Sequence, residues 1–128
     1  MEIFIPGNVP SSKNSKTWTG KFLISSPTTQ RYKKATEHYF MLYKMSFRKL
    51  FGNKKPMNVG LYFIRDSKRR FDYINACQIV ADLMVKYGWI EDDSADFFVP
   101  VFLGYHTDKK QAGVKIKPIL VTPMASPD

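Results

Sequence analysis

The sequence predicts an α+β domain in which a single mixed or antiparallel sheet of about five strands is covered by two main helices. The 128 residues are 44% hydrophobic, which is enough apolar surface to form one folded core. Two long segments repeat apolar residues at helical spacing, and short β-rich runs separated by turn formers surround them. Neither a repeat nor a linker divides the chain, so we expect one domain over residues 1–128 in the order β-β-α-β-α-β-β.

The first half of the chain predicts two strands and a long helix. Residues Glu2 to Pro6 and Lys21 to Ser25 read as strands, and polar turn formers fill residues 7–16 between them. Ser26 followed by Pro27 is a helix start, because serine caps free N–H groups and proline fits the first helical position. We expect this helix to end near Gly52. Its apolar face comprises Tyr32, Ala35, Tyr39, Tyr43, Phe47 and Leu50. Cations decorate the rest, which we interpret as the solvated back of a core helix rather than a membrane-surface helix.

The second half predicts a strand, a helix and two further strands. The strand covers Asn58 to Ile64, and the helix begins at Asp72 and ends at Tyr87, before Gly88. The apolar stripe of this helix comprises Ile74, Cys77, Ala81 and Met84, widened by Val80 and Leu83. An acidic loop follows, and the last strands are expected at residues 97–106 and 114–121.

Positive charge is concentrated in the first part of the chain. The net charge is +9, and residues 1–71 carry fifteen basic and three acidic side chains, whereas residues 72–128 carry five and eight. Such an excess favours a polyanion such as nucleic acid, because binding releases condensed counterions. An anionic membrane surface is an alternative partner on charge alone.

Export and membrane insertion are not indicated. No stretch approaches the ~20 apolar residues of a membrane span, and the N-terminus lacks a basic region followed by an apolar one. The single cysteine, Cys77, cannot form an internal disulfide or a cysteine-rich zinc site. A cytoplasmic location is therefore expected.

The chemistry is predicted where a basic run meets carboxylates. Lys68, Arg69 and Arg70 can neutralise phosphates, while Asp72 and Asp93 offer oxygen ligands for magnesium. Phosphodiester hydrolysis needs this pairing, because the metal stabilises the crowded negative charge and the cations hold the backbone for attack. A helix from Asp72 to Tyr87 is roughly 24 Å long. An extended return to Asp93 recovers roughly 17–20 Å, so the loop can bring this residue beside the helix start.

Several short motifs occur in a characteristic order. The opening strand runs into Pro10-Ser11-Ser12-Lys13-Asn14, and residues 22–32 form a strand followed by a helix with a Tyr-Lys step. The central stretch contains the following residues: Arg69-Arg70, Asp72, Asn75, Asp82-Leu83, Gly88-Trp89-Ile90 and Asp92-Asp93. In order and spacing this sequence resembles the RusA-type Holliday junction resolvases of bacteria and their phages, over most of the chain.

The resemblance implies a homodimeric, magnesium-dependent endonuclease that nicks branched DNA in a bacterial or phage-infected cell. Manganese can substitute for magnesium, and neither a small-molecule cofactor nor a membrane is implied. Asp72 matches the first aspartate of the family's Asp-x-Asp-Asn-x-x-Lys motif, and Asp93 matches its closing aspartate. Ile74 stands at the motif's second aspartate and Gln78 at its lysine, so one ligand and one cation are lost. The replacements left open by the sequence are Asp92, Glu91, Asp96, Asp66 or Asn75 for the ligand, and Lys68 or Lys13 for the charge.

The candidate residues also have structural interpretations. Asp72 is placed to cap a helix through the N–H of Asn75, and Asp92 and Asp93 are typical turn residues. Lys13 and Asn14 either line a DNA groove or form a turn. The basic run 68–70 is either a phosphate contact or a solvated connection.

Three functions are therefore distinguished. The first is a structure-selective endonuclease acting on four-way junctions or related branches. The second is a catalytically impaired module that binds branched nucleic acid without cutting, as Ile74 and Gln78 favour. The third, an RNA-binding domain, fits the charge but lacks the aromatic-basic signature of an RNA recognition motif.

Overall fold

The fold is an α+β arrangement of one mixed sheet and three helices, described by a computed structural model for residues 2–11, 16–18, 23–25, 27–52, 56–92, 94 and 96–119. The helices and strands follow one another along the chain as β1 (Ile3–Pro6), β2 (Lys16–Trp18), β3 (Leu23–Ser25), α1 (Pro27–Leu42), α2 (Lys44–Phe51), β4 (Met57–Arg65), α3 (Tyr73–Lys86), β5 (Phe98–Thr107) and β6 (Gly113–Pro118). The predicted α+β class is thus confirmed.

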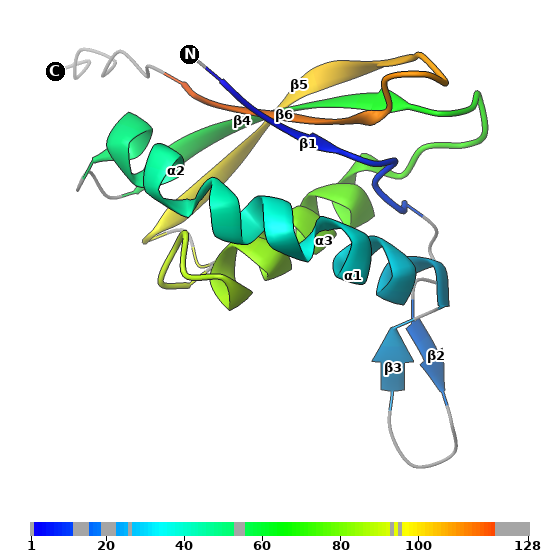
Figure 1. The fold of residues 1–128 in the computed structure, drawn as a ribbon, viewed down its shortest axis with the longest axis horizontal. Coiled ribbons are helices and arrows are strands. Elements are labelled where there is room, and N and C mark those ends of the chain that lie inside the picture. The colour runs from blue at the N-terminus through cyan, green and yellow to red at the C-terminus, as the bar shows by residue number, and fades with distance from the viewer. Residues whose placement is uncertain are drawn as a thin grey trace, which may run out of the picture.

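The main sheet has four strands in the order β1-β6-β4-β5 (Figure 1). Strand β4 pairs with β5 in parallel and with β6 antiparallel, and β6 pairs antiparallel with β1. The sheet is therefore mixed, as one of the two predicted forms. Strand β5 lies at one edge, which accommodates Pro100 because an edge strand tolerates a residue without an N–H.

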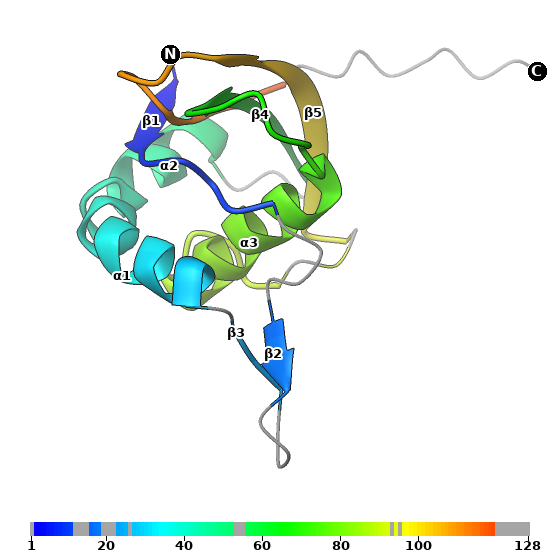
Figure 2. The same cartoon turned by 90° about the vertical axis from the view of Figure 1, so that its right-hand side faces the viewer.

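The prediction of about five strands in one sheet is wrong. Strand β3 pairs with β2 in a separate two-stranded sheet, with Lys16 opposite Ser25. Figures 1 and 2 show this hairpin extending away from the main sheet and the helices. Strand β3 therefore forms its backbone hydrogen bonds with β2, its neighbour in sequence, and does not join the main sheet.

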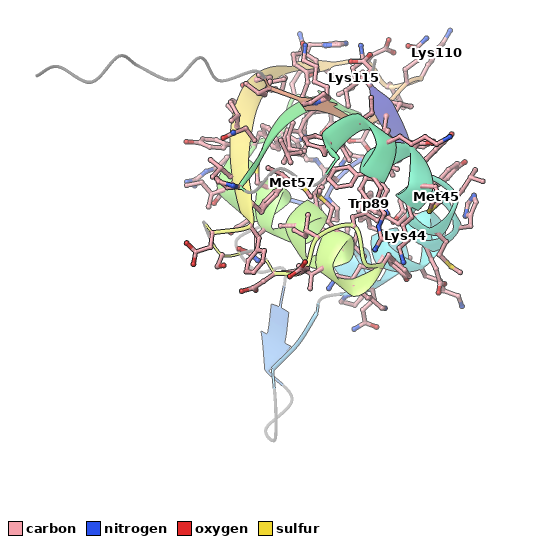
Figure 3. The ribbon with its side chains drawn as sticks, turned by 90° about the vertical axis from the view of Figure 1, so that its left-hand side faces the viewer. Lys44, Met45, Met57, Trp89, Lys110 and Lys115 are labelled. Carbon is pink, nitrogen blue, oxygen red and sulfur yellow. The ribbon has the colours of Figure 1, made fainter. Side chains whose placement is uncertain are left out.

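The three helices lie on one face of the sheet (Figure 2). The single helix predicted between Ser26 and Gly52 is divided at Tyr43, whose φ of −92° and ψ of 4° leave the helical range. The division coincides with a hydrogen bond of 2.7 Å from the indole Nε1 of Trp89 to the carbonyl oxygen of Phe40. In an uninterrupted helix that oxygen would accept from the N–H of Lys44. Trp89, labelled in Figure 3, also packs in tilted contacts against Phe40 and Phe47, with ring centres 5.1 and 4.8 Å apart.

The core lies between the sheet and these helices. The sheet contributes Val59, Leu61, Phe63, Val114 and Ile116, and the helices contribute Tyr32, Phe40, Phe47, Ala76, Val80, Leu83 and Met84. Two predicted core positions are wrong, since Ala35 and Ile74 are exposed. On α1 the buried face includes Thr36 instead, whose hydroxyl donates to the carbonyl oxygen of Tyr32 at 2.8 Å and so satisfies its own burial.

Among the helices that the structure describes, none combines the length and the apolar character needed to cross a membrane.

Candidate nucleic-acid interface

Three segments meet at the end of the sheet where β4 leads toward α3. The backbone N–H of Asp66 donates to Oδ1 of Asn8 at 3.0 Å, which ties the N-terminal loop to this end. The backbone N–H of Asp108 donates to the carbonyl oxygen of Arg65 at 2.8 Å, which ties the β5–β6 connection to it as well. The segment between Arg65 and Asp72 is therefore held from two sides before α3 begins.

Arg65 is the buried cation of this segment, with only 6% of its surface exposed. Its Nη1 donates to the carbonyl oxygen of Arg69 at 3.2 Å, and its guanidinium carbon lies 4.5 Å from the centre of the Phe71 ring. Burial lowers the pKa of Arg65, and the nearby Asp66 and Tyr105 oppose that shift. Its Nε is buried and has no acceptor in the described part of the chain. Arg65 thus folds the connection back over an aromatic ring.

The basic run 68–70 lies on the outside of this turn. Lys68, Arg69 and Arg70 are all exposed, and the backbone N–H of Arg69 donates to the hydroxyl of Ser67 at 3.4 Å. Exposed cations on a backbone that is itself tied down are suited to phosphate contacts. Other cations lie elsewhere on the surface, including Lys110 and Lys115 above the sheet (Figure 3).

Asp72 occupies the N-cap of α3. Its Oδ1 accepts from the backbone N–H of Asn75 at 3.4 Å, and its Oδ2 accepts from the side-chain amide of Asn75 at 3.3 Å. The predicted capping role is confirmed by the first of these bonds. Both bonds are longer than the usual length of about 2.9–3.0 Å, and a carboxylate has about four lone-pair sites, so capping leaves acceptor capacity on Asp72. The cap and the predicted ligand role are therefore compatible.

The two positions that depart from the resolvase motif share a groove between α3 and β5. Ile74 is 66% exposed, and the side-chain amide of Gln78 donates to Oδ1 of Asp82 at 2.8 Å. Both line a cavity of about 220 Å³ together with Tyr73, Cys77, Ala81, Phe98, Pro100 and Phe102. Where the family motif has an acid and a cation, this chain therefore has a mainly apolar groove.

The acidic loop is attached at the other end of α3. Glu91 lies beside Met57 and Phe97 around a cavity of about 400 Å³, and the N–H of Met57, the first residue of β4, donates to the carbonyl oxygen of Phe97. Asp72, by contrast, lies in the connection that leaves the last residue of β4. The 14 residues of α3, about 21 Å, separate the two ends, and Figure 1 shows the yellow loop beyond the C-terminal end of the helix.

Three predicted site residues, Lys13, Asn14 and Asp93, lie outside the described residues, so their proposed roles stay predictions. Asp92 and Asp96 are described and exposed in the acidic loop, and Asp66 is exposed at the other end of β4. Over the described ranges, no group of three His, Cys, Asp or Glu side chains is close enough to hold a metal ion.

The donors around Asp72 fit magnesium only in part. Magnesium is commonly held by one or two carboxylates, with water and substrate phosphate completing its shell. Asp72 would supply one carboxylate, whereas Asn75 presents its amide nitrogen, and not its oxygen, to Oδ2 of Asp72. A second carboxylate depends on Asp93.

An aromatic cluster at this end of the sheet is not apparent from the sequence. Phe71 and Tyr73 flank Asp72, and Phe102 and Tyr105 join them from β5. The ring centres of Tyr73 and Phe102 are 4.4 Å apart, and those of Phe71 and Tyr105 are 5.0 Å apart. The sequence shows the aromatic residues directly after the basic run. It does not show that β5 lies beside β4 with Tyr105 opposite Phe63, which brings the rings of β5 to this end of the sheet.

Comparison of the chain with protein-family models and with curated protein sequences finds no match.

Proposed function

We propose that this protein is a structure-selective DNA endonuclease that resolves four-way junctions or related branched DNA by metal-dependent phosphodiester hydrolysis. One observation carries the proposal: Asp72 caps α3 directly after the exposed run Lys68, Arg69 and Arg70. This combination supports a site where a phosphate is held by cations beside a carboxylate. The N-terminus of α3 adds the partial positive charge of its free N–H groups.

Each group has a defined part in this proposal. The basic run binds the sugar-phosphate backbone, and Arg65 fixes its backbone through the carbonyl oxygen of Arg69. Asp72 and the predicted ligand Asp93 would hold magnesium or manganese, with Asn75 beside Asp72. Asp92 directly follows Glu91 at the opposite end of α3, too far from Asp72 to share an ion with it. When bound, such a metal supplies charge stabilisation for the phosphate and lowers the pKa of a bound water. Lys13 and Asn14 would contact DNA from the N-terminal loop.

A homodimer follows from the geometry of the substrate. A four-way junction has two-fold symmetry, and paired nicks require two equivalent sites. Two copies of the chain related by a two-fold axis would place one Asp72 site on each of the two strands that are cut.

A second candidate is a resolvase-like module that binds branched nucleic acid without cutting. It is favoured by the groove around Ile74 and Gln78, where the amide of Gln78 is engaged by Asp82. The attachment of the acidic loop beyond the C-terminal end of α3 favours it as well. In this case the basic run keeps its role, and Asp72 acts as a helix cap.

The experiment compares binding and nicking of one synthetic four-way junction. We expect the purified chain to nick the junction with magnesium or manganese, and Asp72→Asn and Asp93→Asn to abolish nicking while binding in EDTA persists. Glu37→Gln, an acid-to-amide change at an exposed position on α1, is the matched control. Binding without nicking at every metal concentration would favour the module, and loss of nicking in the control would remove the assignment of Asp72.

A further inference from the structure

A contiguous set of aromatic rings runs from the core to the surface at the start of α3. The buried Phe63 contacts Phe71 with ring centres 5.3 Å apart, and Phe71 contacts Tyr105 at 5.0 Å. Phe102 stacks on Tyr73 at 4.4 Å with an interplanar angle of 23°. The outer members are open to solvent, with Phe102 36%, Tyr73 44% and Tyr105 54% exposed. Anchored rings of this kind can receive a further ring without first becoming ordered.

Cations lie directly beside these rings. The exposed run Lys68, Arg69 and Arg70 precedes Phe71 in the chain, and the guanidinium of Arg65 lies over the Phe71 ring while donating to Arg69. Arg65 therefore fixes the distance between the basic backbone and the aromatic cluster. Proteins that bind single strands combine these same two elements, cations for the backbone and rings for the bases.

We propose that unpaired bases stack on Tyr73, Phe102 and Tyr105, while the exposed cations of residues 68–70 hold the adjoining phosphates. This proposal rests on the proposed function, because it requires the chain to bind DNA. The substrate feature recognised is then a stretch of unstacked nucleotides, as found where a duplex branches, gaps or frays. Stacking tolerates any base, so the site selects for unpaired structure rather than for sequence.

The charge around the rings favours nucleotides over a second copy of this chain. Two copies docked face to face here would bring the basic runs of both copies toward each other across a two-fold axis. Pairing through the edge strand β5 would meet Pro100, which has no N–H to donate. A polyanion meets neither obstacle, because its phosphates neutralise the cations.

The test measures equilibrium binding by fluorescence anisotropy in EDTA, so that cutting does not interfere. The probes are a perfectly paired duplex and the same duplex with a short single-stranded gap. We expect Tyr73→Leu and Tyr105→Leu each to weaken binding to the gapped probe about tenfold. Binding to the paired duplex should stay within about twofold, since phosphate contacts dominate it. Tyr62→Leu, which removes a half-buried tyrosine of β4 that bonds His106, is the control and should leave both affinities unchanged.

A direct probe is 2-aminopurine in the gap, whose emission falls when it stacks. We expect quenching by the unaltered chain and by Tyr62→Leu, and weaker quenching by Tyr73→Leu and Tyr105→Leu. Equal losses on both probes, no loss on the gapped probe, or conversion of a dimer to a monomer in the Tyr73→Leu variant would overturn the proposal. Gap-selective binding without nicking of any junction would overturn the endonuclease function and leave the stacking site standing. Nicking of a junction, together with an unchanged affinity of both variants for the gapped probe, would overturn the stacking site and leave the endonuclease function standing.

Discussion

The guanidinium of Arg65 lies 4.5 Å from the centre of the Phe71 ring, in a position almost closed to solvent. The same side chain donates to the carbonyl oxygen of Arg69, so one buried cation connects the end of β4 with both the basic run and the aromatic cluster. Arg65 therefore determines how the connection enters α3, and substitutions there should affect stability before they affect chemistry.

We expect Arg65→Ala to lower the free energy of unfolding by about 2–4 kcal/mol, because the substitution removes the packing of a long side chain, a charged hydrogen bond and a cation–π interaction together. Urea unfolding monitored by circular dichroism measures the change. Arg69→Ala is the matched control and should stay within about 0.5 kcal/mol, since its side chain is exposed. Equal effects of the two substitutions would remove the special role of Arg65.

Asp72 should contribute to stability through its cap and to chemistry through its charge. Asp72→Ala should lower the free energy of unfolding by about 1 kcal/mol, because the N–H of Asn75 loses its acceptor. Asp72→Asn should have little effect on unfolding, since asparagine caps as well as aspartate. Thermal unfolding of both variants measures this difference. Equal losses in the two variants would show that the carboxylate charge, rather than the cap, stabilises the helix start.

The basic run should determine the salt dependence of DNA binding. Each of Lys68, Arg69 and Arg70, replaced singly by Gln, should reduce the slope of log affinity against log salt by about 0.9 for every duplex phosphate that its cation neutralises. Titrations of a labelled duplex at several salt concentrations measure the slope. Lys86→Gln, at the opposite end of α3, should leave it unchanged. A slope unaltered by all three substitutions would exclude the run from the interface.

Cys77 should react slowly with alkylating agents although it lines the groove. Burial raises the pKa of its thiol to about 11, against an ordinary value of 9.0, so the folded chain keeps the thiol proton between these values. At pH 8 iodoacetamide should therefore modify Cys77 about a hundredfold more slowly than a free cysteine, because only the thiolate reacts. The free energy of unfolding should fall as the pH rises from about 9 through 11, because the unfolded chain loses the thiol proton at a lower pH than the folded chain does. Mass spectrometry of timed samples, with denatured chain as control, measures the rate.

How much the sequence reveals depends on whether a feature is local. The start of α1 at Pro27 and the cap at Asp72 are both predicted correctly, because each depends on a few adjacent residues. The first helix is divided at Tyr43, where the carbonyl oxygen of Phe40 accepts from Trp89, 49 residues further along the chain. No local pattern contains that contact.

Helical spacing predicts that Ile74 is buried, but its side chain is exposed because of its place relative to the sheet. The buried face of α3 is Ala76, Ile79, Val80, Ala81, Leu83 and Met84, while Ile74 in the first turn lies beside the open groove next to β5. Because β5 is the edge strand, nothing in the described chain continues the sheet over Ile74. Edge position is a property of strand order, which residue spacing does not encode.

Because Ile74 is exposed, the resemblance to the resolvase motif can be tested directly by substitution. Ile74→Asp together with Gln78→Lys introduces an acid and a cation at the positions where the resolvase motif has them, and neither substitution disturbs the core. The new lysine would face Asp82 at the i,i+4 spacing that Gln78 already uses, so stability should change by no more than about 1 kcal/mol. We expect nicking of a four-way junction to rise about tenfold or more, because one restored electrostatic contact to a reacting phosphate is typically worth that much. Single-turnover nicking with magnesium measures the gain, and Ile74→Asn with Gln78→Leu is the uncharged control. A double variant that folds and binds the junction but gains no nicking would show that cutting, if present, relies on a rebuilt site rather than on the family's motif positions.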